Sequence, residues 1–337
     1  MMKNSTTITD SRGIDGKPLS TPVPEDEFLH QIDENSHYAT TETSYFGFNI
    51  PEHQINGEIY VWFHPQLHVM SASVYIWKGF KSSTLACEYI NHFGLLPMLE
   101  GDIDDYGIEE LGLNVKVVEP LNEINISYQD ENRGMAFTIG YKAIMPPAGR
   151  PGGQHFAQSM RTKGQLQLAG ADYEIDGYFT RDRSWAGIRE ETTRGGPPMT
   201  WMVGAFNDEL AFHALAFDDP AKNPEWLDAY PGRPPGRNMI WGYVRRDGET
   251  IPLESASKLT TRDTDGLAPT RFDLALTEVG GREHEITGTV TARMPWQTWQ
   301  NMNVYFCQTQ WELDGKIGWG DSQDIQYNDF VHRFQRS

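Results

Sequence analysis

The chain is poor in cysteine, in basic residues and in long apolar runs. Cys87 and Cys307 are the only cysteines among its 337 residues, which excludes a disulfide framework and a cysteine-based metal motif. Both have apolar or aromatic neighbours, which favours core positions over a nucleophilic role. No segment approaches the run of about 18 apolar residues that a transmembrane helix needs, and the N-terminus lacks the apolar centre of a signal peptide. We therefore expect a cytoplasmic protein without a membrane span.

Positive charge is scarce as well. Lys and Arg number 28 against 47 Asp and Glu, which gives a formal net charge of −19. Such a surface repels phosphate backbones, so nucleic acid is excluded as a partner. The Gly-rich segments GRPGG (149–153) and PGRPPGR (231–237) lack the strand–loop–helix setting and the Lys-Ser/Thr of a phosphate-binding loop. Ser159 and Ser184 lack a G-x-S-x-G motif, so a hydrolase triad is not supported.

Short alternating segments are abundant. GEIYVWFH (57–64) puts Ile59, Val61 and Phe63 on one face of a strand, and SASVYIWKGF (71–80) repeats the pattern. NEINISYQD (122–130) and MAFTIGYKAI (135–144) alternate on either side of a polar turn. Period-two patterning with frequent turn signals predicts antiparallel strands. Helix signals are few, with one short helix expected within residues 92–112. The fold class is therefore all-β, built as two consecutive β-sandwiches or barrels.

A Pro- and Gly-rich segment, MPPAGRPGG (145–153), is the best candidate for a domain boundary. We expect a loosely ordered arm over residues 1–35, an N-terminal β domain over 36–150 and a C-terminal β domain over 151–335. We expect either a monomer or a homodimer.

The segment GYFTRDRSWAGIRE (177–190) combines three arginines, an aspartate and a tryptophan. If it is a strand, Arg181, Arg183 and Trp185 share one face, whereas Asp182 and Ser184 share the other. One interpretation is a structural ion-pair network with Trp185 as packing. The other is a carboxylate in an apolar cavity, where Asp182 would act as a general acid or base.

Residues 155–189 resemble the AttH-like and carotenoid-hydratase group of paired lipocalin-like domains. The segment matches an Asp-(Arg or His)-Ser-Trp-Gly-x-Arg signature through Asp182, Arg183, Ser184, Trp185, Gly187 and Arg189, with Ala186 inserted. WELDGKIGWGDSQ (311–323), where Asp321 follows Gly318 and Gly320, resembles the group's C-terminal strand. The resemblance covers residues 155–325 and, more weakly, 42–65.

This resemblance implies two lipocalin-like β domains with an apolar cavity near their junction. It implies a hydratase/dehydratase or an isomerase/cyclase that needs no cofactor, and therefore a lyase or isomerase. The substrate would be a bulky, hydrophobic terpenoid, steroid or polyketide-like molecule. Protonation of a C=C bond needs an acid kept neutral in a dry pocket and π faces that stabilise the cation. The alternatives are a carrier that binds a hydrophobic metabolite without transforming it, and a partner-binding subunit.

The candidate residues follow from these two lines of argument. Asp182 is the expected acid, and the catalytic candidates are Asp182, Tyr178, His155 and Arg189. The substrate-binding candidates are Trp185, Arg183, Tyr45, His64, Trp62, Trp241 and Trp311. His64 and His68, with His53 nearby, are candidate metal ligands by spacing. Pro65 and the absence of a suitably spaced carboxylate instead favour cavity polarity or surface positions, so no metal is expected.

Overall fold

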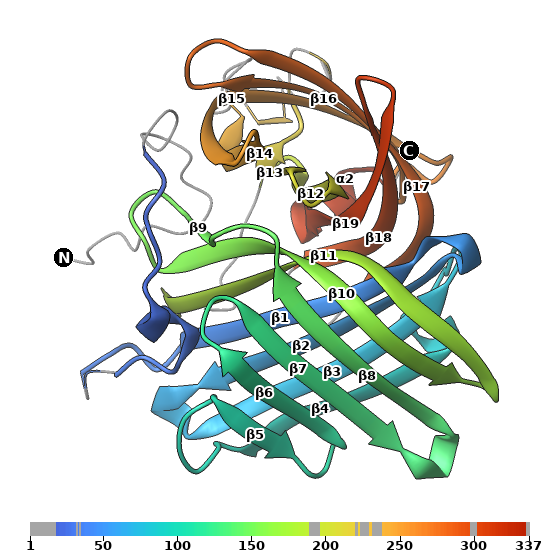
Figure 1. Ribbon diagram of the computed structural model, residues 1–337. Helices are drawn as coiled ribbons and strands as arrows, with labels where there is room; N and C mark the ends of the chain where they lie inside the picture. The colour runs from blue at the N-terminus through green and yellow to red at the C-terminus, as the bar shows by residue number, and fades with distance from the viewer. Residues whose placement is uncertain are drawn as a thin grey trace. The chain divides into compact units, whose positions relative to one another are not determined.

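The computed structural model divides into two compact units, each described here by itself. The first unit comprises Ser20–Lys78 and Cys87–Glu190, and the second includes Gly79–Ala86 and Glu191–Ser337. In Figure 1 the strands of the first unit run from blue to yellow-green and those of the second from yellow to red. The structure describes residues 18–188 apart from 32 and 34, and residues 196–219, 222, 229–230, 238–296 and 302–334.

The first unit is a single antiparallel sheet of eleven strands. Its strand order is β4-β3-β2-β1-β11-β10-β8-β7-β6-β5, and β9 pairs with β10. The strands are β1 (Thr40–Ile50), β2 (Ile55–His64), β3 (Val69–Lys78), β4 (Tyr89–Pro97), β5 (Asp105–Ile108), β6 (Leu113–Glu119), β7 (Glu123–Asp130), β8 (Met135–Ala143), β9 (Ala148–Gly149), β10 (His155–Leu168) and β11 (Ala171–Ile188).

The alternating side chains of these strands separate into two faces. Ile59, Val61 and Phe63 of β2 join a large apolar core on the inner face of the curled sheet. Tyr60 and Trp62 alternate with them and therefore lie on the other face. The period-two pattern seen in the sequence thus determines which residues build the core and which remain for a site.

The second unit is a closed barrel of eight antiparallel strands. The strands are β12 (Met199–Asn207), β13 (Leu210–Phe217), β14 (Met239–Arg246), β15 (Glu249–Arg262), β16 (Pro269–Glu278), β17 (Glu283–Trp296), β18 (Met302–Leu313) and β19 (Lys316–Tyr327). Trp311 is fully buried in the barrel core, where its ring contacts Phe212 and Phe272. Gly204 and Gly288 leave room for this ring, because a Cβ on either would lie within 3 Å of it.

The β3–β4 loop also belongs to the second unit. The backbone N–H of Lys81 donates to the carbonyl of Arg293 (2.8 Å), and the N–H of Arg293 donates to the carbonyl of Gly79 (3.0 Å). Because the pairing between β16 and β17 ends at Thr289, these two bonds use backbone groups of β17 beyond that point.

Within the residues that the structure describes, helical structure consists of short segments. They are η1 (Pro24–Glu27), η2 (Pro51–His53), η3 (Pro65–Leu67), η4 (Thr84–Ala86), η5 (Glu131–Arg133) and the α-helix α2 (Asn328–Phe334). None of the helices in the described part of the chain combines the length and apolar character needed to cross a bilayer.

The all-β class with two lipocalin-like parts is confirmed, but two details differ. The short helix expected within 92–112 is wrong, because this region forms most of β4 and all of β5. The compact units divide after Glu190 rather than at 150/151, because β10 and β11 pair with β8 and β1 of the first sheet.

The expected arm is only partly within the described residues. Residues 1–17 lie outside them, whereas η1 is helical and its Glu27 side chain is buried with 2% exposure.

Candidate functional site

Arg181 is held by an ion pair inside the first unit. Its guanidinium donates to both carboxylate oxygens of Glu27 at 2.6 and 2.7 Å, and to the side-chain oxygen of Gln158. Burial alone would raise the pKa of Glu27, but the charge and hydrogen bonds of Arg181 bring that pKa below its usual value. Arg181 and Glu27 therefore form a structural ion pair.

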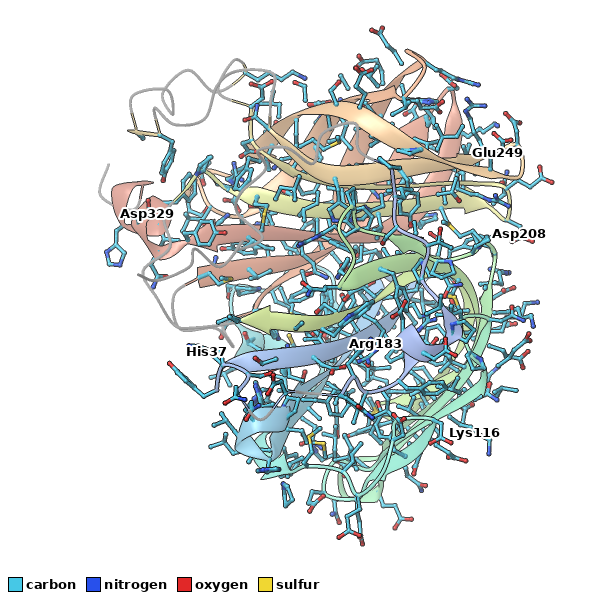
Figure 2. All side chains as sticks on the ribbon, turned by 90° about the vertical axis from the view of Figure 1, so that its left-hand side faces the viewer. His37, Lys116, Arg183, Asp208, Glu249 and Asp329 are labelled. Atoms are coloured by element: carbon cyan, nitrogen blue, oxygen red, sulfur yellow. The ribbon has the colours of Figure 1, made fainter. Side chains whose placement is uncertain are left out.

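Arg183, two residues further along β11, has a similar role. Its guanidinium donates to Glu42 (3.1 Å), to the carbonyl of Phe28 (2.6 Å) and to the hydroxyl of Ser44 (3.1 Å). Arg183 is completely buried and is labelled beside the ribbon of the first unit in Figure 2, whereas the side chain of Lys116 projects outward. The ion-pair interpretation of this segment thus describes both arginines.

The inserted residue Ala186 forms a β-bulge. Thr43 pairs with Ser184 and Thr41 pairs with Gly187, so two residues of β11 oppose one residue of β1. Ala186 has a φ of 55°, in the left-handed region. Arg189, whose register this insertion affects, lies outside the described residues.

Trp185 lies on the arginine side of β11. Its ring stacks on His30 with centroids 4.4 Å apart and an interplanar angle of 9°, and it meets Phe156 edge-on. Because side chains alternate along a strand, Trp185 faces away from the side of the sheet that carries Asp182.

Asp182 belongs to a row of residues that crosses five strands. It pairs directly with Tyr45 of β1, which pairs with Tyr60 of β2; Tyr60 pairs with Ser73 of β3, and Ser73 with His92 of β4. Directly opposed residues of antiparallel strands point to the same side of a sheet. The register therefore assembles one face, the Asp182 face, which lies opposite the apolar core.

Aromatic rings cover the middle of the Asp182 face. The rings of Tyr45 and Tyr60 are 5.1 Å apart, and those of Tyr60 and Trp62 are 4.3 Å apart. Tyr45 and Trp62 are buried, and Asp182 is 9% exposed. The arrangement thus combines one carboxyl group with several π faces.

Hydroxyl groups flank Asp182 along the strands. The hydroxyls of Thr43 and Ser184 are 2.6 Å apart, and those of Ser159 and Thr180 are 3.0 Å apart. By register these four side chains lie on the same face as Asp182. They supply hydrogen-bonding groups beside the carboxyl group.

His92 lies at the β4 end of the row. Its Nδ1 is 3.3 Å from the hydroxyl of Tyr75, and its ring meets that of Trp62 at 6.2 Å. Partial burial lowers the pKa of His92, which favours the neutral imidazole. His92 was not among the residues singled out from the sequence. Only the pairing between β3 and β4 shows that it lies near Tyr75 on this face.

The structure brings together four of the sequence candidates and separates others. Asp182, Tyr45 and Trp62 share the Asp182 face, and His155 reaches it by pairing with Ser184. Tyr178 lies on the same side of β11 but two side-chain positions further along.

Tyr178 and the histidine candidates have other surroundings. The Arg161 guanidinium lies 4.8 Å from the Tyr178 ring centroid. His64 ends β2 with its Nδ1 3.5 Å from the hydroxyl of Thr41, and His68 follows η3 in a left-handed conformation. His53 packs against Tyr173. Across the described stretches, no group of three His, Cys, Asp or Glu side chains has the arrangement of a metal site.

The two tryptophan candidates of the second unit lie on different sides of the barrel wall. Trp311 is in the core, and its indole N–H donates to the carbonyl of Val203 at 2.8 Å. Trp241 and Trp201 each lie with their ring centroids 4.2 Å from His213, which is fully buried between them. Sequence reasoning missed His213, which the alternating segment ELAFHALAF contains.

Sequence reasoning also missed an ionic cluster inside the barrel. The Lys258 ammonium forms an ion pair with Asp218 and donates to the hydroxyls of Thr200 and Thr260. Lys258 and Asp218 are completely buried. Burial lowers the pKa of Lys258, and the nearby carboxylates offset part of that effect.

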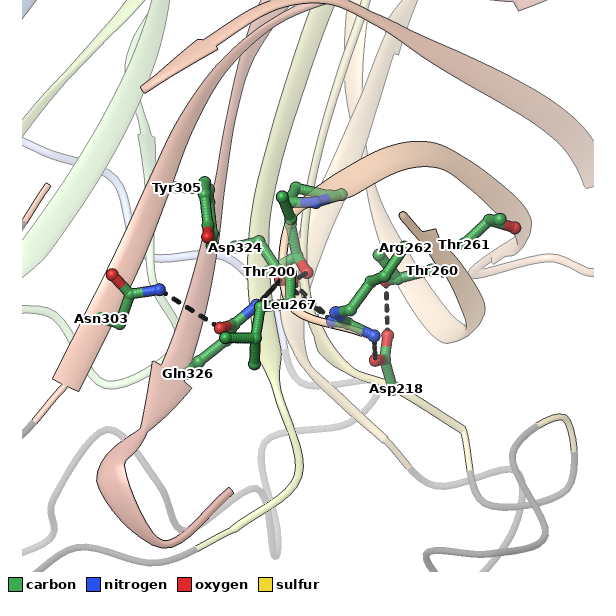
Figure 3. A network of polar contacts seen from close by, with 12 residues as sticks. Thr200, Asp218, Thr260, Thr261, Arg262, Leu267, Asn303, Tyr305, Asp324 and Gln326 are labelled. Atoms are coloured by element: carbon green, nitrogen blue, oxygen red, sulfur yellow. Dashed lines mark hydrogen bonds and ion pairs between the residues drawn. The ribbon is translucent and has the colours of Figure 1, made fainter. Parts of the chain in front are cut away.

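Arg262 joins this cluster from the same strand as Lys258. It binds Asp218 at 2.9 Å and both oxygens of Asp324 at 3.0 and 3.1 Å, as Figure 3 shows. Its guanidinium also lies 5.5 Å from the ring centroid of Phe330 in α2. Two cations and two carboxylates balance, so the cluster is suited to fastening strands and α2 rather than to binding an ion.

Two open grooves lie on a different part of the first sheet. Their volumes are about 420 and 370 Å³, and Asn114, Ser127 and Thr138 line both. No sequence candidate contributes to either groove.

Comparisons with known proteins agree with this fold. A family model described as "Domain of unknown function (DUF7064)" matches residues 23–330. Kievitone hydratase from Nectria haematococca is similar in structure, with a TM-score of 0.51 and 15% identity over 93% of this chain and 97% of that one. An AttH-like protein from Nitrosomonas europaea has a TM-score of 0.55 and 14% identity over 93% and 98%. A search of curated protein sequences found no significant match. The resemblance to the AttH-like group is thus confirmed at the level of the fold.

Proposed function

Because the chain belongs to the DUF7064 family and has the fold of a hydratase, we propose that it is a lyase or isomerase that uses Asp182 as its acid–base group. The substrate would be a bulky, largely apolar alkene of the terpenoid, steroid or polyketide-like kind. One observation carries the proposal: the Asp182 carboxyl group shares a face with the aromatic rings of Tyr45, Tyr60 and Trp62.

The chemistry starts with proton transfer. In hydration, the Asp182 carboxylic acid gives its proton to one alkene carbon, so a C–H bond forms and the adjacent carbon becomes cationic. Water then forms a C–O bond and releases a proton, and the sum is the addition of one water molecule. In isomerisation, the cation instead loses a proton from a neighbouring carbon. Both routes need an acid beside an apolar substrate.

The aromatic rings of the Asp182 face would stabilise the cation. The π faces of Tyr45, Tyr60 and Trp62 attract positive charge. The hydroxyls of Thr43 and Ser184 would orient the attacking water or a polar substituent of the substrate. His155, which pairs with Ser184, is a further candidate for this role.

The test uses water addition as the readout. Purified protein is incubated with kievitone, the compound named in the similar structure, and with a panel of terpenoid and steroid alkenes. Mass spectrometry then detects products that have gained or lost one water, or isomers of unchanged mass. We expect Asp182→Asn to reduce turnover of the accepted substrate by about 100-fold or more.

Asp176→Asn is the matched control. Asp176 lies on the same side of β11 but is exposed and paired with Arg161, so this variant should keep wild-type turnover. Full turnover by Asp182→Asn would refute the assigned acid. Ligand that is retained by the purified protein and never transformed would favour a carrier instead.

A further inference from the structure

Glu58 is a second buried carboxyl group on the Asp182 face. It lies in the middle of β2, where it alternates with the core residue Ile59, and its exposure is 0%. It pairs directly with Gly47 of β1 and with Tyr75 of β3. A glutamate on the outer side of a strand is ordinarily in water, so complete burial at this position calls for a specific role.

The position of Glu58 relative to Asp182 follows from the register. Tyr60, two residues further along β2, pairs with Tyr45, which pairs with Asp182. Glu58 is thus two strands and two residues away from Asp182 on one face. Strand spacings of about 4.8 Å and rises of about 3.4 Å per residue separate the two backbone positions by about 12 Å.

That separation suits two carboxyl groups acting on opposite ends of one reaction. A substrate C=C bond with an attacking water needs room between a proton donor and a proton acceptor. Carboxyl pairs that activate a water between them are known to lie further apart than pairs that act by direct attack. Tyr45 lies beside Asp182 on β1, and Tyr60 lies two residues from Glu58 on β2, so both rings are close to the space between the two carboxyl groups.

We propose that Glu58 is the second acid–base group of the reaction, an inference that rests on the proposed function. Asp182 gives its proton to the alkene carbon, the C–O bond to water forms, and the proton that water loses goes to Glu58. Asp182 ends as the carboxylate and Glu58 as the acid, and exchange with solvent restores the starting state. In dehydration the same two groups exchange roles.

The experiment measures the pH dependence of kcat/KM with a substrate that the wild-type enzyme accepts, beginning with kievitone. The base must be ionised and the acid protonated, so the wild-type profile should be bell-shaped. Glu58→Gln should lower kcat by about 100-fold with little change in KM and should lose the low-pH limb. Asp182→Asn should lose the high-pH limb. Glu285→Gln, at an exposed position of β17, is the control and should retain both limbs.

Formate added to Glu58→Gln supplies a small carboxylate, and recovery of turnover would support a chemical role. Glu58→Asp is the second variant, for use if Glu58→Gln does not fold. It keeps the carboxyl group but holds it closer to the backbone, because the side chain is one methylene shorter. Its kcat should fall by about tenfold with the low-pH limb retained. The proposal would be overturned if Glu58→Gln kept the wild-type kcat and both limbs of the pH profile. If Glu58→Gln does not fold, a wild-type kcat in Glu58→Asp would overturn it. If the wild-type enzyme transforms no probe, the proposed function fails; if only the Glu58 variants behave as wild type, this inference alone fails.

Discussion

Neighbouring charged residues on β11 have opposite environments because side chains alternate across a strand. Arg181 points to the core side and is completely buried against Glu27, which lies 154 positions earlier in the chain. Asp182, the next residue, points to the aromatic side, opposite Tyr45. A single peptide step therefore separates a residue that stabilises the fold from the residue that we assign to the chemistry.

The ion pair of Arg181 gives the first prediction. Arg181→Met leaves the Glu27 carboxylate buried beside an apolar side chain, and breaking a buried pair in this way costs about 3–5 kcal/mol in the free energy of unfolding. Arg181→Met combined with Glu27→Leu should recover most of that loss, because neither charge remains. Urea denaturation measures both variants.

Lys116→Gln is the control for this experiment. Lys116 and Asp105 form an exposed pair, so the substitution should leave the urea midpoint almost unchanged. A wild-type midpoint for Arg181→Met would show that the buried pair does not stabilise the fold.

At the scale of elements, glycines decide how closely strands and rings approach. Gly288 of β17 faces Trp311 of β18, and a Cβ at this position would lie 2.3 Å from the indole ring. Gly204 of β12 faces the same ring from the other side. The barrel thus closes around one large side chain that three strands have to accommodate.

Gly288→Ala therefore forces Trp311 or the backbone of β17 to move. Overpacking of this kind costs about 1–3 kcal/mol, which should lower the thermal midpoint of the barrel by several degrees in calorimetry. Gly94→Ala in β4 is the control, because the atom nearest to its Cβ would be 4.0 Å away. Equal midpoints for the two variants would contradict the packing described for Trp311.

The alternation of side chains along strands made much of the fold predictable from the sequence. Contacts between residues far apart in the chain could not be predicted in this way. The patterns around Tyr60 and Trp62 correctly indicated strands with an aromatic face. The partners of Lys258 could not be read from the sequence, because Asp218 lies on another element and only barrel closure brings it within reach. The short helix predicted within 92–112 is wrong, because part of this segment pairs as β4 and β5 of the sheet.

The Asp182 segment was predicted more completely than its surroundings. Its division into two faces followed from spacing alone, as did the alternative of an ion-pair network. The bulge at Ala186 and the row through Tyr45 and His92 depend on register between distant strands, which local pattern does not encode.

At the scale of the whole molecule, the net charge is −19, so the buried ion pairs belong to a protein with a strongly acidic surface. Burial would raise the pKa of Asp324, but Arg262 and Lys258 lower it below its usual value. A carboxyl group whose folded pKa is lowered contributes stability above its unfolded pKa of about 3.9 and loses it as the pH falls through the folded value. Glu27 acts in the same direction.

Acid should therefore destabilise the barrel through this cluster. The thermal midpoint of the wild-type protein should fall as the pH is lowered below about 4. Asp324→Asn should lower the midpoint at pH 7 and flatten its decline in acid, because the titrating group is gone. Calorimetry between pH 7 and pH 3 measures this, and a variant with the wild-type slope would show that Asp324 does not control acid stability.

The measurement that tests the central claim most directly is the transfer of solvent deuterium to the substrate carbon. Wild-type protein and Asp182→Asn are equilibrated in D₂O and mixed with the accepted alkene, and NMR follows deuterium at the carbon that gains a proton. We predict a C–D bond in the wild-type product and its near absence with Asp182→Asn. Equal deuterium incorporation by both proteins would contradict the assignment of Asp182 as the proton donor.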